Sequence, residues 1–307
     1  MTHKIAIVGL GKIARDQHLP SIAKNPDFEL AAIVSRNAEL ESVDHFQALD
    51  DMLAARPDIG TVALCTPPQV RRQYAEAAIR AGRHVLLEKP PGATVAEVEW
   101  LKNLAAKHGV TLFATWHSRY AQGVEPARTW LAGKTIKSVD IVWREDVRRW
   151  HPGQDWIWEP GGMGVFDPGI NALSILSHML PAPVLVTGAV LEVPENRQTP
   201  IAAKIDFVAV TGHLVTADFD WRQEGPQTWD ITVRTDAGLL ELSSGGAVLR
   251  IDGDTQLAAD DTEYDGIYAH FAALLAQGKS DVDIAPLQLV ADACMLGEMR
   301  KVEAFIE

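Results

Sequence analysis

The feature that most constrains the fold is an apolar run that leads directly into a glycine-rich turn. Residues 4–10 read Lys-Ile-Ala-Ile-Val-Gly-Leu, a pattern typical of a strand buried on both faces of a parallel sheet. Residues 9–14 form a Gly-x-Gly-x-x-Ala turn, and a helix is expected after it to about Lys24. In such a turn the first glycine permits a tight bend, the second lets a pyrophosphate approach the backbone, and the small Ala14 lets helix and strand pack closely. The predicted dinucleotide contacts are Gly9, Gly11, Lys12 and Ile13.

Strand-like and helix-like segments then alternate through the first third of the chain. Further strands are expected at 28–34, 59–65, 84–87 and 111–116, and helices at 47–55, 69–81 and 95–108. This alternation predicts an α/β domain with a doubly wound parallel sheet, which we place at residues 1–119.

The periodicity changes after Arg119. A helix at 124–132, a strand at 138–147 and a helix at 162–180 are followed by alternating runs at 184–193, 202–210, 215–221, 229–235, 238–242 and 248–251. Glycine, proline, asparagine and aspartate separate these runs, as tight turns between antiparallel strands require. Two closing helices are expected at 262–277 and 286–305, which makes residues 120–307 an α+β domain.

Charge and cysteine usage narrow the class of protein. The formal net charge is −13, so neither nucleic acid nor a membrane surface is expected as a partner. The N-terminal residues lack the pattern of a signal peptide and of a bilayer-spanning segment, which predicts a cytoplasmic protein. Cys65 and Cys294 have no metal-ligand spacing around them, so we expect neither a disulfide framework nor a bound metal.

The end of the second expected strand bears on the choice of coenzyme. An NAD-preferring site usually has an acidic residue here to bind the ribose 2′-hydroxyl, whereas this chain has Ser35-Arg36. Arg36 can stack on adenine and pair with a 2′-phosphate, with Ser35 adding a hydrogen bond. The sequence therefore predicts NADP, alone or alongside NAD; the alternative is that Arg36 is an ordinary surface arginine.

Two other strand ends carry residues with a chemical role. Cys65-Thr66-Pro67 forms a rigid turn at the carboxyl edge of the sheet, where coenzymes lie. Glu88-Lys89 follows an apolar strand at the same edge, with Glu88 expected beside the coenzyme. Lys89 is in position to hydrogen-bond a substrate hydroxyl and to lower the pKa of a neighbouring proton donor. The alternative for Lys89 is a solvated surface lysine.

A further candidate is the glycine-rich stretch 162–171, because Asp167 and Asn171 stand one helical turn apart. Residues four apart share a helix face, so a carboxylate and a carboxamide are expected to point the same way. The alternative reading is that Asp167 only caps a helix whose apolar residues belong to the core.

Taken together, the glycine turn, Glu88-Lys89-Pro90 and the stretch 162–171 resemble the glucose–fructose oxidoreductase and inositol dehydrogenase (Gfo/Idh/MocA) family. The resemblance implies an N-terminal Rossmann domain, a C-terminal α+β domain on a large, mostly antiparallel sheet, and NAD(P)-dependent chemistry on carbohydrates. The runs 10–20, 113–119 and 145–154 are similar to the members of this family that oxidise L-arabinose and D-galactose at C1.

By this resemblance Lys89 matches the catalytic lysine of the family and Asp167 the acid of its Asp-x-Gly-x-His pattern. Asn171 stands where many members have a histidine that acts as base, a departure that puts a histidine-dependent mechanism in doubt. An anomeric hydroxyl is more acidic than an ordinary alcohol, so a weaker base suffices. We expect Asp167 to be that base, with Lys89 as its electrostatic partner and Asn171 orienting the hydroxyl; the opposite assignment of Asp167 and Lys89 stays open.

A cluster of aromatic and polar residues is the expected sugar site. Indole rings stack on the C–H faces of sugars, while hydroxyls need charged or amide partners. The candidates are His117, Glu145, Trp150, His151, Trp156 and Trp158. Tight loop packing or a subunit contact is the alternative for Trp156 and Trp158, and a structural role is the alternative for His117.

The resulting hypothesis is an enzyme that oxidises C1 of L-arabinose, D-galactose or D-fucose to the lactone with NAD(P). One alternative is a dehydrogenase or reductase of another sugar or a cyclitol, and another is a dinucleotide-binding sensor without catalysis. The sheet of the second domain is expected to pair two copies of the chain into a homodimer.

Overall fold

The computed structural model describes residues 2–41 and 43–306, which form two compact units. The first unit is Met1–His117 with Tyr264–Ile284, and the second is Ser118–Glu263 with Ala285–Glu307. The first break in the chain thus falls within two residues of the expected boundary at 119. The return of a late segment to the first unit was not expected.

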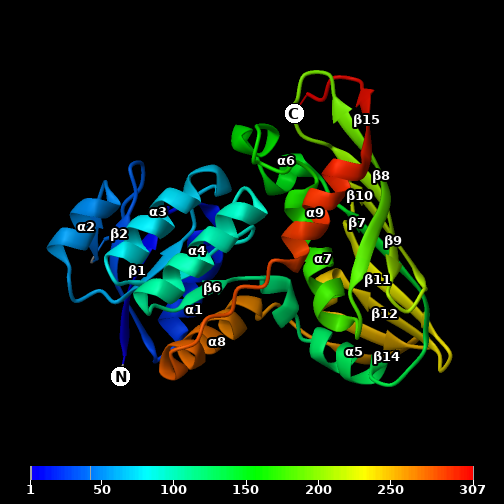
Figure 1. Ribbon diagram of the computed structural model, residues 1–307, viewed down its shortest axis with the longest axis horizontal. Helices are drawn as coiled ribbons and strands as arrows, with labels where there is room; N and C mark the ends of the chain where they lie inside the picture. Colours follow the sequence, from blue (N-terminus) through cyan, green and yellow to red (C-terminus); the bar gives the residue numbers. More distant parts are fainter. Residues whose placement is uncertain (1, 42, 307) are drawn as a thin grey trace. The chain divides into compact units, whose positions relative to one another are not determined.

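The first unit is built on a parallel sheet of six strands, in the order β3-β2-β1-β4-β5-β6 (Figure 1). The strands are β1 (His3–Val8), β2 (Phe28–Val34), β3 (Asp44–Phe46), β4 (Thr61–Leu64), β5 (His84–Leu87) and β6 (Leu112–Ala114). This order is that of a doubly wound dinucleotide-binding fold, in which strand order reverses beside β1, so the predicted fold class is confirmed. The short strand β3 was not predicted.

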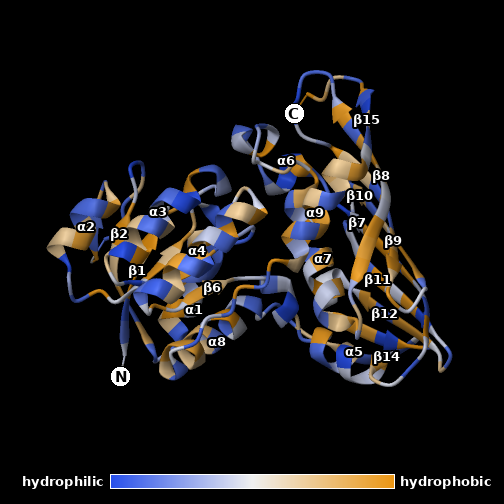
Figure 2. Ribbon diagram, viewed as in Figure 1, coloured by the Kyte–Doolittle hydropathy of each residue, from blue (hydrophilic) through white to orange (hydrophobic). Residues whose placement is uncertain are grey.

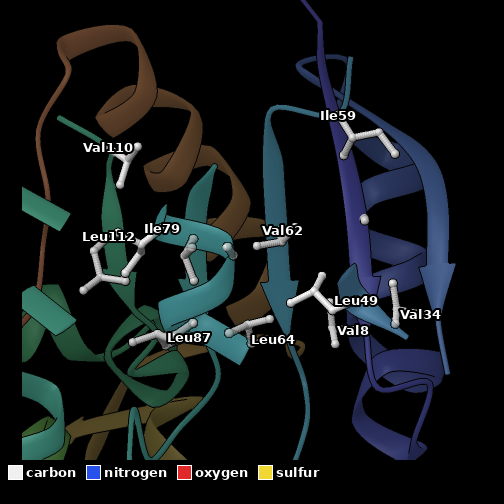
Figure 3. Packing of buried hydrophobic residues seen from close by; sticks show 14 of the residues in the cluster. Val8, Val34, Leu49, Ile59, Val62, Leu64, Ile79, Leu87, Val110 and Leu112 are labelled. Atoms are coloured by element: carbon white, nitrogen blue, oxygen red, sulfur yellow. The ribbon is translucent and has the colours of Figure 1, made fainter. Parts of the chain in front are cut away.

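Helices pack on this sheet through their apolar sides. They are the π-helix η1 (Ala14–His18), α1 (Leu19–Lys24), α2 (Leu49–Ala55), α3 (Pro68–Arg80) and α4 (Val95–His108). Helix α4 begins at a Thr94 cap, whose hydroxyl accepts the Glu97 N–H at 3.2 Å, and ends at Gly109 in the left-handed conformation. Figure 2 shows its alternation of polar and apolar residues. Figure 3 shows the core between sheet and helices, where Val62, Leu64 and Ile79 are fully buried.

Helix α8 (Glu263–Gln277) corrects the expectation that both closing helices belong to the second domain. Its Phe271 ring stacks on Phe28 of β2 at 5.7 Å between centroids and on Phe113 of β6 at 6.0 Å. After the helix, Asp281 pairs with Phe113 in a parallel bridge at the edge of the sheet. The reason for the correction is that the apolar face of α8 is complementary to aromatic residues on strands β2 and β6, a pairing that local periodicity does not reveal.

The second unit is built on a nine-stranded, mostly antiparallel sheet, in the order β14-β13-β12-β11-β7-β10-β9-β8-β15 (Figure 1). The strands are β7 (Ile136–Arg144), β8 (Val184–Pro194), β9 (Ala202–Ala209), β10 (Leu214–Asp220), β11 (Thr228–Thr235), β12 (Leu239–Ser243), β13 (Val248–Ile251), β14 (Asp254–Ala258) and β15 (Gly297–Val302). The β7–β10 and β8–β15 pairs are parallel. Alternate residues of these strands are buried, which is why the sequence predicted them.

Helices α5 (Val124–Leu131), α7 (Phe166–Met179) and α9 (Ala285–Leu296) lie against one face of this sheet (Figure 1). Two short helices, α6 (Val147–Trp150) and η3 (Asp155–Trp158), lie in the segment before α7. The helix expected to reach residue 305 is wrong beyond Leu296, because the chain there becomes β15 and pairs with the edge strand β8. Among the described residues, no helix is both long and apolar enough to cross a membrane.

Candidate active site

The turn after β1 has the geometry that a bound dinucleotide requires. Gly9 has φ +93°, and a Cβ on it would lie 3.1 Å from the main chain of Cys65 and Thr66. Only glycine tolerates that conformation and that approach. A Cβ on Gly11 would instead meet open space, which leaves its backbone accessible to a ligand. Lys12 is exposed and pairs with Asp16, and Ile13 is half-buried at the start of the helix.

The ends of β4 and β5 are held together by a buried arginine. The guanidinium of Arg71, a residue of α3 that is 3% exposed, donates to the carbonyl oxygens of Thr66, Glu88 and Pro90. Arg71 was not predicted as a site residue, because an arginine within a helix carries no sequence signal that its partners will be carbonyls at two strand ends. Arg71 therefore fixes the backbone on both sides of Lys89.

One polar atom at this edge of the sheet lacks a hydrogen-bond partner. The Thr66 hydroxyl oxygen is buried, and no group among the described residues bonds to it. A buried hydroxyl is normally satisfied, so this one is suited to a ligand at the carboxyl edge of the sheet. With the open approach at Gly11, it makes the first unit fit a dinucleotide.

The residues expected to contact the coenzyme stand directly after β1, β2, β4 and β5, so the parallel sheet brings their backbones to one edge. Ser35 is half-buried: its N–H donates to the Phe46 carbonyl at 2.9 Å, and its own carbonyl lies 2.7 Å from His45 Nε2. Arg36 is exposed at the end of β2. Cys65 and Pro67 are half-buried on either side of Thr66.

Glu88, which is expected beside the coenzyme, is the centre of a buried hydrogen-bond network. Its carboxylate is 3% exposed, and Oε1 lies 2.9 Å from His18 Nε2 and accepts the Tyr264 hydroxyl at 2.8 Å. Oε2 accepts the backbone N–H of Lys89 at 2.9 Å. The other ring nitrogen of His18 lies 2.7 Å from the Tyr268 hydroxyl. Both carboxylate oxygens are therefore engaged inside this unit, and Oε2 holds the backbone of Lys89.

This network is electrostatically coupled. Burial would raise the pKa of Glu88, but the hydrogen bond and charge of His18 outweigh it, with help from His117 and Arg71, and bring the pKa down to about 2. Burial would lower the pKa of His18, but Cys65, Tyr268 and Glu88 raise it well above its usual value. Burial also raises the pKa of Tyr268 to about 12. The pair is thus an imidazolium and a carboxylate with no access to water.

The two remaining site residues of the first unit are Lys89 and His117. Lys89 is half-buried two residues after the end of β5. The His117 ring stacks on Tyr264 with centroids 5.5 Å apart and an interplanar angle of 23°. His117, expected to contact the sugar, is therefore packed against a tyrosine of the Glu88 network.

In the second unit, the glycine-rich stretch positions the start of α7. Gly164 has φ +56°, and a Cβ on it would lie 2.3 Å from the Pro200 carbonyl oxygen. The neighbouring Val165 N–H donates to that same oxygen at 2.7 Å, which ties the loop to the segment before β9. The helix then begins at Phe166, four residues later than predicted, and Asp167 is its second residue.

Asp167 is not the helix cap; its carboxylate contacts a histidine instead. Its side chain is 4% exposed, and Oδ2 lies 3.3 Å from Nε2 of His151, whose side chain is 17% exposed. Asn171 follows one turn later on α7 and is half-buried. The structure thus brings Asp167 together with His151, a pairing that sequence spacing did not predict.

Glu145 holds two tryptophans that the sequence analysis did not single out. Trp221 donates its indole N–H to Oε1 at 3.1 Å, and Trp229 donates to Oε2 at 2.9 Å. The Glu145 carboxylate is buried, so this arrangement satisfies a charge that would otherwise be costly there. Trp221 directly follows β10 and Trp229 lies at the start of β11, positions that carry no local signal of a shared partner.

The tryptophan cluster is packed around these indoles. The His151 ring lies 5.3 Å from Trp221, and Trp150 lies 5.5 Å from Trp229. Trp158 is 3% exposed and contacts Trp221 at 5.3 Å. Trp156 is half-buried in η3. The burial of Trp158 favours the packing alternative for that residue, while Trp150, His151 and Trp156 retain exposed surface.

Comparisons with known proteins agree with this geometry. A family described as an oxidoreductase family with an NAD-binding Rossmann fold matches residues 3–115. The galactose 1-dehydrogenase of Pseudomonas fluorescens is 45% identical over 305 residues, 99% of each chain. The crystal structure of D-galactose-1-dehydrogenase from Rhizobium etli superposes with a TM-score of 0.95 at 58% identity, covering 99% of this chain and 98% of that one.

A more distant structure shows the fold alone. A 3-ketoreductase from Actinomadura kijaniata, in complex with TDP-benzene and NADP, has a TM-score of 0.85 at 19% identity and covers 98% of this chain and 100% of its own. On the strength of the family match and the relatives that span the whole chain, this protein is a member of the Gfo/Idh/MocA oxidoreductase family, and its first unit is the NAD-binding Rossmann domain of that family.

Proposed function

We propose that the chain is an NAD(P)-dependent aldose 1-dehydrogenase that oxidises C1 of D-galactose, L-arabinose and D-fucose to the lactone. The observation that carries this proposal is the likeness over the whole length to two galactose 1-dehydrogenases. D-Galactose and L-arabinose share the configuration of their ring hydroxyls and differ by a hydroxymethyl group at C5. A pocket that recognises the shared hydroxyls and tolerates that group accepts both sugars.

In this proposal the first unit binds the coenzyme. The backbone at Gly9, Gly11, Lys12 and Ile13 receives the pyrophosphate, and Thr66 and the adjoining Cys65 and Pro67 border the nicotinamide half. When bound, the nicotinamide accepts a hydride at C4. Arg36 pairs with the 2′-phosphate of NADP and Ser35 adds a hydrogen bond, which favours NADP while NAD is still accepted. The half-buried position of Lys89 and the exposed Arg36 support these roles.

The remaining roles concern the reacting hydroxyl. Lys89 donates a hydrogen bond to the C1 hydroxyl, and its charge favours loss of the hydroxyl proton. Asp167 takes that proton and Asn171 orients the hydroxyl through its amide. The second unit supplies the sugar site, with Trp150, His151 and Trp156 as contacts and Glu145 holding the wall of indoles. His117 of the first unit is a further sugar contact.

The test is absorbance of the reduced nicotinamide with purified protein, NADP or NAD, and a panel of D-galactose, L-arabinose, D-fucose, D-glucose, D-xylose and myo-inositol. Turnover on the first three sugars is expected. Lys89→Ala should lower kcat by about a hundredfold or more, the usual size of an acid–base contribution, while Lys107→Ala on the exposed side of α4 should leave it unchanged. Turnover on myo-inositol alone would identify a cyclitol dehydrogenase, and coenzyme binding with no turnover would identify a sensor.

We also propose that two copies associate through the sheet of the second unit. Leu185, Val208 and Leu214 are aligned across β8, β9 and β10, on the face opposite the buried alternate residues. Leu185 is 60% exposed and Leu214 65% exposed. A row of exposed apolar side chains on a sheet face is suited to self-association about a twofold axis.

A further inference from the structure

The Asp167–His151 pair has a feature that the proposed roles leave unused. The ring of His151 lies between two oxygen atoms, Asp167 Oδ2 at 3.3 Å from Nε2 and Gln154 Oε1 at 3.3 Å from Nδ1. An imidazole with acceptors at both nitrogens is suited to the protonated state, because both N–H groups then donate. When the proton between Asp167 and His151 is absent, two lone pairs face each other. The pair is therefore suited to bind one proton between Asp167 Oδ2 and His151 Nε2.

An aspartate is a weaker base than an imidazole, so Asp167 alone is less suited than His151 to retain a proton near neutral pH. An ordinary aspartic acid has a pKa of about 3.9, whereas an ordinary imidazole has one of about 6.5. The position of Asp167 in the first turn of α7 favours its ionised form, because the positive end of the helix dipole lies there, whereas the burial of its side chain favours the neutral form. Asn171 does not titrate, so it gives the proton no further place to go. His151, whose Nε2 lies 3.3 Å from Asp167 Oδ2, is a neighbour of a residue type that titrates near neutrality.

The other charged groups around His151 have partners of their own. The Glu145 carboxylate is held by Trp221 and Trp229, and Trp221 lies against the His151 ring. On α6, Arg148 is paired with Asp146 and Glu224, and the Arg149 guanidinium lies over the Trp150 ring. Among the contacts described here, the Asp167 carboxylate is the charged group that lies against a ring nitrogen of His151.

We propose that Asp167 and His151 act as one proton-accepting pair, in which Asp167 takes the proton of the C1 hydroxyl and His151 receives it. In the oxidation, the C1 hydroxyl proton passes to Asp167, the C1–H bond breaks with its electron pair leaving as hydride to the oxidised coenzyme, and C1 becomes the lactone carbonyl. The proton then moves from Oδ2 of Asp167 to Nε2 of His151. His151 retains 17% side-chain exposure, so the imidazolium can release the proton to water. This inference rests on the proposed function for its chemistry, but the coupling within the pair can be tested without turnover.

The first experiment follows the ring signals of His151 by NMR as a function of pH, in protein without sugar. The signal is assigned by its disappearance in His151→Asn. Asp167→Asn should lower the midpoint of the His151 titration by about one pH unit, because the opposite charge that favours the imidazolium is removed. Asp155→Asn, at an exposed aspartate of η3, should leave the midpoint unchanged. An unchanged midpoint in Asp167→Asn would overturn the pairing whether or not the enzyme oxidises sugars.

The second experiment measures kcat and KM against pH with the best sugar of the panel. Wild type should lose kcat on the acidic side of the midpoint found by NMR. His151→Asn should lower kcat near neutral pH by about a hundredfold and shift the acidic limb of the pH profile, besides any effect on KM from the lost sugar contact. His213→Asn, at a turn between β9 and β10, is the matched control.

The outcomes separate the two proposals. A raised KM with unchanged kcat and pH profile in His151→Asn would reduce His151 to a sugar contact and overturn its role as proton acceptor. A wild type that oxidises no sugar would overturn the proposed function, and the NMR result would then still report on the coupling of the pair.

Discussion

Arg36 is the residue on which the choice between NADP and NAD is expected to depend. Its guanidinium is exposed directly beyond Ser35, at the end of β2, where no acidic residue is present to bind a ribose hydroxyl. Arg36→Ala should raise the KM for NADP about tenfold, the loss expected for a charged hydrogen bond, and should leave the KM for NAD nearly unchanged. Arg80→Ala, at an exposed position of α3, is the matched control. Equal changes in the KM values for NADP and NAD would mean that Arg36 is an ordinary surface arginine that does not contact the 2′-phosphate.

Single residues differ in how far the sequence could identify them. Asp167 and Asn171 could be singled out because their spacing places them one turn apart on a helix. The partner of Asp167 could not, since His151 reaches it from a separate loop at 3.3 Å and only the folded chain brings the two together. The same holds for Glu145, whose two indole partners lie 76 and 84 residues away in sequence.

At the scale of elements, the Glu88–His18 pair links β5, η1 and α8. Removing one partner of a buried ion pair leaves the other charge unpaired, so Glu88→Gln should lower the free energy of unfolding by about 3 kcal/mol near pH 5.5. Glu159→Gln, at an exposed loop position, should change it little. Urea unfolding followed by circular dichroism gives both values. A difference close to zero at this pH would mean that Glu88 and His18 do not form a charged pair.

The pH dependence of that difference follows from the directions of the two pKa shifts. The pKa of Glu88 is lowered to about 2 in the fold, so its contribution is present above its usual value of 4.5 and is lost as the pH falls through the folded value. The pKa of His18 is raised, so its contribution is full below the usual value of 6.5 and is lost as the pH rises through the folded value. The free energy of unfolding of the wild type should therefore exceed that of Glu88→Gln by the largest amount between pH 4.5 and 6.5. Unfolding curves that give the same difference at about pH 9 would contradict the charged state of His18.

Helices and strands were predictable where the apolar pattern extends over many residues or where a capping residue or a glycine stands at the boundary. Helix α4 has the predicted bounds, and Thr94 and Gly109 mark its two ends in the structure. Strand β2 also has the predicted bounds, with a continuous apolar run. Strands β3 and β14 were not predicted, since each is short and has little buried surface of its own. Strand β15 follows α9 without a break, and only the open edge of β8 gives it a partner.

For the molecule as a whole, the first unit is discontinuous in sequence, and this predicts the behaviour of a fragment. A fragment of residues 1–119 lacks α8, so Phe28 and Phe113 lose the aromatic ring of Phe271 that stacks on both. Such a fragment should unfold without a cooperative thermal transition. Joining residues 264–284 to it through a flexible linker should restore cooperativity. Calorimetry of the two fragments is the test. If the unit ended at residue 119, the fragment with residues 264–284 and the fragment without them would both unfold cooperatively.

The state of association is the second prediction at this scale. Wild type should have twice the chain mass of 33.5 kDa by light scattering, and Leu185→Asp with Leu214→Asp should reduce it to that of one chain, because charges on the sheet face oppose its burial. Met295→Asp, at a residue of α9 that is 84% exposed, is the control for a charge added to an exposed apolar site. A dimer that survives both leucine changes would place the contact elsewhere.

The return of the chain to its first unit has a consequence for how the protein is made. The first unit is complete only when residues 264–284 have been made, and these follow most of the second unit in the chain. Proteins with continuous domains complete the N-terminal one while the rest is still being translated. Here the parallel sheet must leave the ribosome with the sites for Phe271 uncovered, and it stays so while nearly 150 intervening residues are added. Chaperone binding during translation should therefore be concentrated on the nascent first unit.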